Sequence, residues 1–156
     1  MKLLYIISAY KLPDQLIRLV NRLDSRETLF FIHVDKKTDI QIYRYLEDKL
    51  SSNKHVTFLK RHISNWGGFG HVRATLKGIK KIIKMGLDFD YLILLTGQDY
   101  PVKSNDYIQE FLEKHKGTSF IAYYDETDRF AEKWKDRLGY WYLDFRENQL
   151  IFPKEN

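Results

Sequence analysis

Polar side chains follow directly after an apolar run in the segment Tyr-Leu-Ile-Leu-Leu-Thr-Gly-Gln-Asp, which begins at residue 91. Five consecutive apolar residues, 91–95, predict a β-strand that is buried on both faces, as in the middle of a parallel sheet. Gly97 permits close approach of a ligand to the backbone, and Pro101 prevents the strand from continuing. Gln98 and Asp99 would therefore lie at the carboxyl end of a strand, where open α/β sheets bind ligands. A plain turn after the strand is the alternative interpretation.

Two further apolar runs end in side chains that could bind the same ligand. Tyr10 follows the first run of the chain, and His33 and Asp35 lie at the end of the second. Because parallel strands end at the same edge of a sheet, Asp35 and Asp99 would share a site suited to hydrogen bonds with the hydroxyl groups of a ribose or a sugar. His33 alternates with Asp35 and would point the same way. Asp35 could instead cap a helix or a turn, and His33 could be a buried, hydrogen-bonded side chain.

A glycine-rich segment, Asn-Trp-Gly-Gly-Phe-Gly at residues 65–70, precedes a predicted helix. Glycines in this position can present backbone N–H groups to an anion or permit close approach of a ligand. Gly67 is one of them, and Trp66 could stack on a base or a sugar, or could instead anchor the loop by packing. The segment matches neither the dinucleotide-binding pattern GxGxxG nor a P-loop, because the Lys-Ser/Thr pair is absent.

Basic side chains, rather than a bound metal ion, are the candidates for neutralising a diphosphate. The chain has no HExxH motif, and the run at 91–95 is followed by a single acid, Asp99, instead of an Asp-x-Asp pair. Mg²⁺ prefers more oxygen ligands than one carboxylate supplies. Lys133 and Arg137 could screen a diphosphate without a metal, unless they belong to a solvated charged face. We therefore expect no metal site and no cofactor.

A sheet is needed to bring these residues together, and the pattern of the chain predicts one. Strand-like apolar runs alternate with segments whose apolar residues recur at helical spacing. This alternation is typical of an α/β fold with a mainly parallel sheet and right-handed crossovers. The predicted strands are 2–8, 29–34, 56–59, 91–95 and 119–124, and the predicted helices are 13–23, 40–50, 69–85 and 105–115.

Length and composition limit the class of protein. The chain has 156 residues, 44% of them hydrophobic, which suits a single domain. No run approaches the roughly 18 apolar residues of a membrane span, and the short apolar start lacks a signal-peptide cleavage site, so we expect a cytoplasmic protein. The formal charge of +5 favours anionic partners and could hold the protein at an anionic membrane surface. The chain has no nucleic-acid-binding motif, and its lack of cysteine fits a reducing compartment.

Three segments together resemble the core-2/I-branching glycosyltransferases, a family that includes β-1,6-N-acetylglucosaminyltransferases and peptide O-xylosyltransferases. They are His-Val-Asp-Lys-Lys at residues 33–37, Trp-Gly-Gly-Phe-Gly-His-Val-Arg-Ala at 66–74 and Leu-Thr-Gly-Gln-Asp-Tyr-Pro-Val-Lys-Ser at 95–104. Their order and spacing are similar to the family pattern over roughly residues 1–140. The Gly-Gly pair after Trp66 resembles the bacterial branch of the family.

The resemblance implies a GT-A type fold, a Rossmann-like α/β sandwich with a mainly parallel sheet that binds a UDP-sugar at its strand ends without a metal ion. It also implies that Asp35 binds the uridine and that basic side chains face the diphosphate. Together with the residues considered above, the expected donor-binding set is Tyr10, His33, Asp35, Trp66, Gly67, Gln98, Asp99, Lys133 and Arg137.

The implied reaction transfers a sugar, expected to be N-acetylglucosamine, from the UDP-sugar to a hydroxyl of a glycan or polysaccharide acceptor with inversion. Members of the family are longer, and their catalytic glutamate lies in the part that would follow residue 156. We therefore expect a truncated, single GT-A domain over residues 1–156 whose catalytic residue is unknown. The alternative is a non-catalytic remnant that only binds the UDP-sugar.

Overall fold

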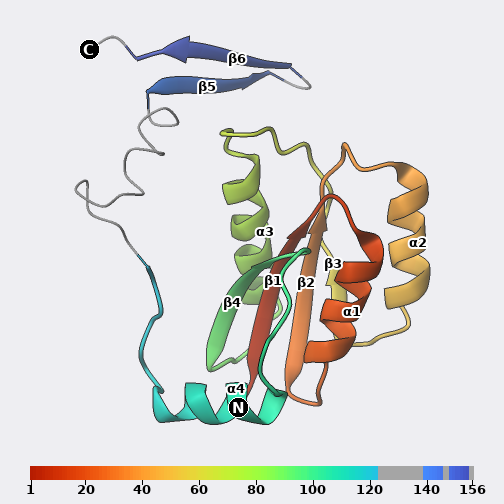
Figure 1. Cartoon of the computed structure of the whole chain (residues 1–156), viewed down its shortest axis with the longest axis vertical. Helices are drawn as coiled ribbons and strands as arrows, with labels where there is room; N and C mark the ends of the chain where they lie inside the picture. The colour runs from red at the N-terminus through yellow and green to blue at the C-terminus, as the bar shows by residue number, and fades with distance from the viewer. Residues whose placement is uncertain (123–138, 146–147, 155–156) are drawn as a thin grey trace.

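The computed structural model describes residues 1–122, 139–145 and 148–154 (Figure 1). Its strands are β1 (Leu3–Ala9), β2 (Thr28–Val34), β3 (Val56–Phe58), β4 (Tyr91–Thr96), β5 (Tyr140–Phe145) and β6 (Asn148–Pro153). Its helices are α1 (Pro13–Leu23), α2 (Ile40–Leu50), α3 (Gly70–Lys84) and α4 (Asn105–Lys114). Four parallel strands form one sheet in the order β3-β2-β1-β4, and β5 and β6 form an antiparallel hairpin. The predicted Rossmann-like α/β fold is therefore confirmed.

β1 lies inside the sheet, and the alternation of its side chains divides the core into two halves. Leu3, Tyr5 and Ile7 pack with residues of α1, α2 and α4 in a cluster of 14 buried residues. Leu4 and Ile6 point to the other face, where they pack with α3 in a cluster of 5 buried residues. Figure 1 shows α1 and α2 on one side of the sheet and α3 on the other. The α/β pattern thus gives a three-layer arrangement with a larger and a smaller core.

The carboxyl ends of β1, β2 and β4 meet at one edge of the sheet, as predicted. Ser8 of β1 pairs with His33 of β2 on one side and with Thr96 of β4 on the other. Just beyond β4, the N–H of Gly97 donates to the Ser8 carbonyl at 2.9 Å. A Cβ atom at Gly97 would lie 2.8 Å from the Cβ of Ala9, so only glycine permits this approach.

Three of the four helices begin at a recognisable start signal. Pro13 occupies the first turn of α1, where its missing N–H costs nothing. The Asp39 carboxylate accepts from the Gln41 N–H at the start of α2, and the Ser104 hydroxyl accepts from the Tyr107 N–H at the start of α4. The predicted bounds of α1 and α2 are confirmed; α3 is one residue shorter than predicted at each end, and α4 is one residue shorter at its C-terminal end. None of the helices in the described part of the chain has the length and apolar character needed to cross a membrane.

Two predictions about the outer side of the sheet were wrong. β4 is an edge strand of the described sheet rather than a strand buried on both faces, and Leu94 is 57% exposed. Residues 119–122 form no strand, and residues 123–124 of that prediction lie outside the described residues. An apolar run indicates strand propensity, but it does not reveal how many neighbouring strands will pair with it.

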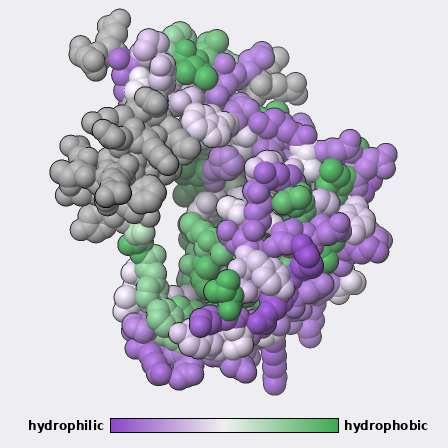
Figure 2. Space-filling view, viewed as in Figure 1, coloured by the Kyte–Doolittle hydropathy of each residue, from purple (hydrophilic) through white to green (hydrophobic). Residues whose placement is uncertain are grey.

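A groove of about 770 Å³ separates β4 from the segment 117–121. Phe89, Leu94 and Phe120 line it and remain substantially exposed. Figure 2 shows apolar side chains gathered on this face, with the surface hollowed between the sheet and the extended segment that follows α4.

Candidate functional site

A cavity of about 440 Å³ opens at the carboxyl edge of the sheet, and we refer to it as the strand-end cavity. Its walls come from the loops that follow β1 and β2, from the loop before α3 and from the first turn of α3. The residues that line it are Tyr10, Asp35, Lys37, Thr38, Ser64, Trp66 and His71. Tyr10, Asp35 and Trp66 are thus three predicted residues that the fold brings together.

Asp35 lies on the wall of this cavity and is only 6% exposed. Its carboxylate accepts a hydrogen bond from the Lys37 N–H at 2.8 Å and another from the Ser64 N–H at 3.2 Å. The side chain therefore shapes the turn after β2, which was one of the two interpretations open at the sequence level. An ionised carboxylate has about four lone-pair positions, so these two hydrogen bonds do not use its full capacity to accept.

Arg61 holds the turn after β2 in place from outside the cavity. Its Nη2 donates to the Asp35 carbonyl at 2.9 Å and to the Thr38 carbonyl at 2.6 Å. The guanidinium lies 4.3 Å from the ring centroid of Tyr43, a cation–π arrangement. The Thr38 hydroxyl in turn donates to the Tyr10 carbonyl at 3.0 Å. The loops after β1 and β2 are therefore fixed to one another.

Trp66 lines the cavity, and both Trp66 and Gly67 lie against Tyr142 of the β5–β6 hairpin. The Trp66 side chain is 58% exposed, and its ring meets that of Tyr142 edge to face at 5.8 Å. Gly67 has φ +71°, and a Cβ there would lie 2.9 Å from the Tyr142 ring. Gly67 is therefore required by backbone conformation and by the packing of β5. Its predicted contact with a donor stays a prediction.

The first turn of α3 also faces the cavity. No side chain caps this helix start, and the first N–H groups of any α-helix lack intrahelical partners and carry partial positive charge. His71 of the first turn and Lys37 of the opposite loop line the same cavity. The Lys37 ammonium donates to the Asn65 side-chain carbonyl at 3.2 Å. These groups make this side of the cavity suited to an anion.

A second cavity, of about 350 Å³, lies on the other side of the start of α3, and we refer to it as the α3 cavity. Its lining is mostly polar and carries three cations and one acid. The lining residues are Lys36, Arg61, His62, Ile63, Asn65, Gly70, Arg73 and Asp144.

His33 is 2% exposed and is not among the residues that line either cavity. Its Nε2 accepts from the His62 N–H at 3.3 Å, and the two imidazole rings lie 4.1 Å apart. Burial, with a smaller contribution from His62, lowers the pKa of His33 to about 4. His33 is therefore a neutral, hydrogen-bonded core histidine, which was the alternative interpretation. The predicted contact of His33 with a sugar donor stays a prediction.

Gln98 and Asp99 lie at the predicted edge but have different surroundings. Gln98 is a hydrogen-bond partner of the Tyr10 phenol; together with Lys11, which has the larger effect, it lowers the pKa of Tyr10. The Asp99 carboxylate accepts from the Thr96 N–H at 2.6 Å and closes the turn after β4. Asp99 lines a small apolar cavity of about 180 Å³ instead of the strand-end cavity.

The two remaining predicted residues, Lys133 and Arg137, lie outside the described residues. Among the described residues, no group of three or more His, Cys, Asp or Glu side chains is placed to hold a metal ion.

Sequence reasoning missed four residues of the strand-end cavity. Lys37 and His71 lie inside two of the segments that carry the family resemblance, so their position next to Asp35 and Trp66 was an available signal. Thr38 and Ser64 have no such signal. They reach the cavity because of how the loops after β2 and β3 fold, and neither loop has a periodic pattern.

The sequence of the chain is similar to a known family and to several known proteins. The family described as Core-2/I-Branching enzyme matches residues 4–155. The chain is 29% identical over 121 residues to Xylosyltransferase oxt of Drosophila melanogaster, and 30% identical over 122 residues to Xylosyltransferase 2 of Rattus norvegicus. Each alignment covers 76% of this chain and 14% of the relative. The chain thus corresponds to a small part of the length of the curated relatives that it matches.

Proposed function

This chain belongs to the Core-2/I-branching enzyme family, a glycosyltransferase family related to xylosyltransferases, and from that premise we propose that the strand-end cavity binds the nucleotide of a UDP-sugar. The observation that carries the proposal is the composition of one cavity wall: Asp35, the exposed Trp66 and His71, from the first turn of a helix that no side chain caps, line the same space. These groups match the parts of a nucleoside diphosphate. A carboxylate can accept hydrogen bonds from the base or the ribose, an aromatic ring can stack on the face of the base, and a helix start can bind the anionic phosphates.

In the proposed complex, Asp35 accepts from the uridine and Trp66 stacks on it, while Tyr10 and Gln98 border the same edge. The diphosphate lies towards the start of α3, where Lys37 neutralises part of its charge without a metal ion and the His71 ring can donate a hydrogen bond. Lys133 and Arg137 are proposed to add to this charge. The α3 cavity, with Lys36 and Arg73 on its wall, offers space beside the phosphates.

The proposed reaction transfers the sugar to a hydroxyl of a glycan acceptor with inversion. Such a transfer needs a base near the acceptor oxygen, and the proposal assigns that role to no described residue. N-acetylglucosamine is the proposed sugar, and xylose is the competing candidate because the relatives above are named xylosyltransferases. Donor binding without transfer is the alternative function.

Isothermal titration calorimetry of the full chain tests the donor proposal. We expect binding of UDP, UDP-N-acetylglucosamine or UDP-xylose, no comparable binding of ADP, and the same affinity in the presence of EDTA. The absence of heat at millimolar UDP contradicts the nucleotide site, and loss of binding in EDTA contradicts its independence of metal. Release of UDP in the presence of acceptor glycans separates transfer from binding alone.

The exposed face of α3 bears on where the protein acts. Arg73, Lys80, Lys81 and Lys84 are exposed along this helix, and such a basic surface attracts anionic lipid headgroups. We propose that the chain contacts an anionic membrane peripherally through α3. Sedimentation with phosphatidylserine vesicles should show binding that weakens as salt is raised.

A further inference from the structure

The hydroxyl of Ser64 is buried and has no hydrogen-bond partner among the described residues. Ser64 is 6% exposed, and its Oγ is one of three buried side-chain polar atoms in the described part of the chain without a partner. Most buried polar atoms in proteins are hydrogen-bonded, because leaving one unpaired is unfavourable. The position of Ser64 offers a physical reason for this exception.

Ser64 lines the strand-end cavity directly beside Asp35. Its N–H donates to the Asp35 carboxylate at 3.2 Å, so the two side chains are neighbours on one wall. Behind it, Gly70 packs so closely that a Cβ at that position would lie 2.4 Å from the Ser64 Cα. The backbone of Ser64 is therefore fixed between the end of β2 and α3, and Ser64 lies beside the Asp35 carboxylate on the wall of the cavity.

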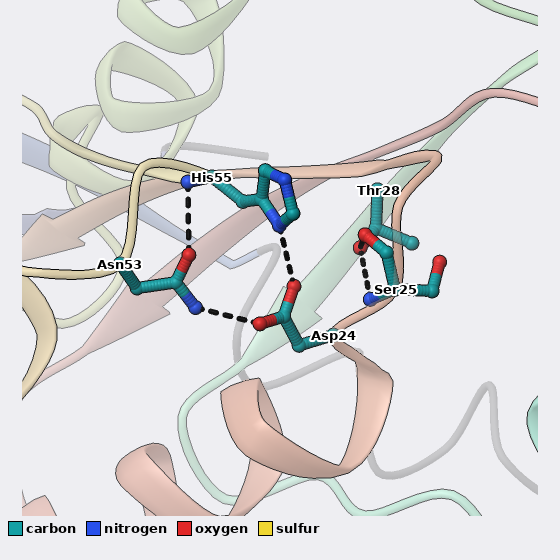
Figure 3. Close-up of polar contacts among 5 residues, drawn as sticks. All are labelled: Asp24, Ser25, Thr28, Asn53 and His55. Carbon is teal, nitrogen blue, oxygen red and sulfur yellow. Dashed lines mark hydrogen bonds and ion pairs between the residues drawn. The ribbon is translucent and has the colours of Figure 1, made fainter.

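Ser25 offers a comparison within the same molecule, because its Oγ is also buried without a partner. Figure 3 shows Ser25 in the turn before β2, where its N–H and carbonyl both bond to the Thr28 hydroxyl. The cavity at Ser25 measures about 10 Å³, whereas the cavity at Ser64 measures about 440 Å³. A single water needs at least about 10–15 Å³. Of these two serines, only Ser64 therefore lines a space that a nucleotide can enter.

We propose that the Ser64 hydroxyl donates a hydrogen bond to a carbonyl of the uracil base while the adjacent Asp35 carboxylate accepts from the uracil N3–H; this inference rests on the proposed function. An ionised carboxylate only accepts hydrogen bonds, and a serine hydroxyl can donate. Side by side they complement the imide edge of uracil, which presents an N–H next to a carbonyl. Cytosine presents an unprotonated ring nitrogen and an amino group there, so its ring nitrogen would face the carboxylate without a proton between them.

The test compares Ser64→Ala with the matched variant Ser25→Ala in the full chain, using UDP and CDP as probes in calorimetry and thermal unfolding as the measure of stability. Each substitution deletes one buried hydroxyl that has no protein partner, so neither should lower the midpoint of unfolding. We expect Ser64→Ala to weaken UDP binding about tenfold, the loss of one hydrogen bond in a complex. CDP affinity should fall less, so the preference for UDP over CDP narrows. Ser25→Ala should bind both nucleotides as the wild type does.

Four outcomes would overturn the inference. Wild-type UDP affinity in Ser64→Ala would remove Ser64 from the site and leave the proposed function standing. An equal loss of UDP affinity in Ser25→Ala would show a general effect of the substitutions. If Ser64→Ala lost affinity for UDP and for CDP equally, Ser64 would not distinguish the two bases. Failure of the wild-type chain to bind any uridine nucleotide would instead reject the proposed function, and this inference with it.

Discussion

Asp35 serves the fold and the candidate site with one carboxylate. Its two hydrogen bonds to backbone N–H groups shape the turn after β2, while the same side chain lines the strand-end cavity. A loss of ligand binding after substitution is therefore ambiguous unless stability is measured beside it. The matched control is Asp39, whose carboxylate caps α2 and does not line the cavity.

We expect Asp35→Ala to weaken UDP binding about tenfold or more and to lower the free energy of unfolding by about 1–3 kcal/mol, because the Ser64 N–H loses its buried acceptor. Asp39→Ala should cost about 1 kcal/mol as a lost helix cap and should leave UDP affinity unchanged. Urea unfolding gives the stabilities, and calorimetry gives the affinities. If Asp35→Ala binds UDP like the wild type, once the folded fraction is taken into account, its role is structural only.

His33 predicts how stability changes with pH. Its pKa falls from about 6.5 to about 4 on folding, so between these values the unfolded chain binds a proton that the folded chain does not. The free energy of unfolding is therefore unaffected by protonation of His33 above about pH 6.5. It decreases as the pH falls towards 4, by about 3 kcal/mol, because each unit of pKa shift corresponds to about 1.4 kcal/mol. Urea unfolding at several pH values should show a shallower profile for His33→Gln. Parallel profiles for the two proteins would contradict this assignment.

The β5–β6 hairpin is the element that covers the glycine-rich loop. The Asn65 amide donates to the Asp144 carboxylate and the Gln149 amide to the Trp66 carbonyl, each at 3.0 Å. Tyr142 lies against Gly67. The hairpin therefore fixes the loop that carries Trp66, and its docking can be tested by adding one methyl group.

Gly67→Ala should destabilise the protein more than Gly86→Ala. Both glycines have positive φ, but a Cβ at Gly67 would meet the Tyr142 ring at 2.9 Å, whereas at Gly86 nothing lies within 4 Å. Gly86→Ala should cost about 1–2 kcal/mol from backbone strain alone, and Gly67→Ala should cost more because the ring must move. Urea unfolding compares the stabilities of the two variants. Equal costs would indicate that the hairpin does not pack on Gly67.

The positions of most elements could be predicted, but their neighbours could not. The period of the apolar residues predicted β1, β2, α1 and α2, because each buries one face or both against a core. It could not place Ser64 or Arg61, whose contacts with the turn after β2 join residues more than 20 positions apart through a loop without periodicity. The edge position of β4 was missed because the same apolar residues suit a strand inside a sheet and an edge strand that borders an apolar groove. The sequence pattern does not distinguish these two cases. The hairpin was also missed, since its aromatic residues alternate too little to indicate a strand.

The groove of about 770 Å³ beside β4 leaves apolar side chains exposed on one side of the sheet. The outer edge of β4 has no strand partner among the described residues, and open edges with apolar side chains favour association between chains. We expect the chain to self-associate in a concentration-dependent way through this edge. Sedimentation velocity should show smaller species for Leu94→Lys, which places a charge in the groove. Val102→Lys is the control, because Val102 is 93% exposed and lies outside the groove; an equal effect of both substitutions would point to net charge instead.

The two halves of the core should not open together. The half between the sheet and α3 holds 5 buried residues, against 14 on the side of α1 and α2, and the free energy of local opening follows the apolar contacts that must be broken. The amide protons of α3 should therefore exchange with solvent before those of α1. Because the first turn of α3 lines the strand-end cavity, a bound nucleotide would slow exchange along the whole helix. Binding of a nucleotide in the cavity would then be detected as slower amide exchange in parts of α3 that lie several turns away from the nucleotide.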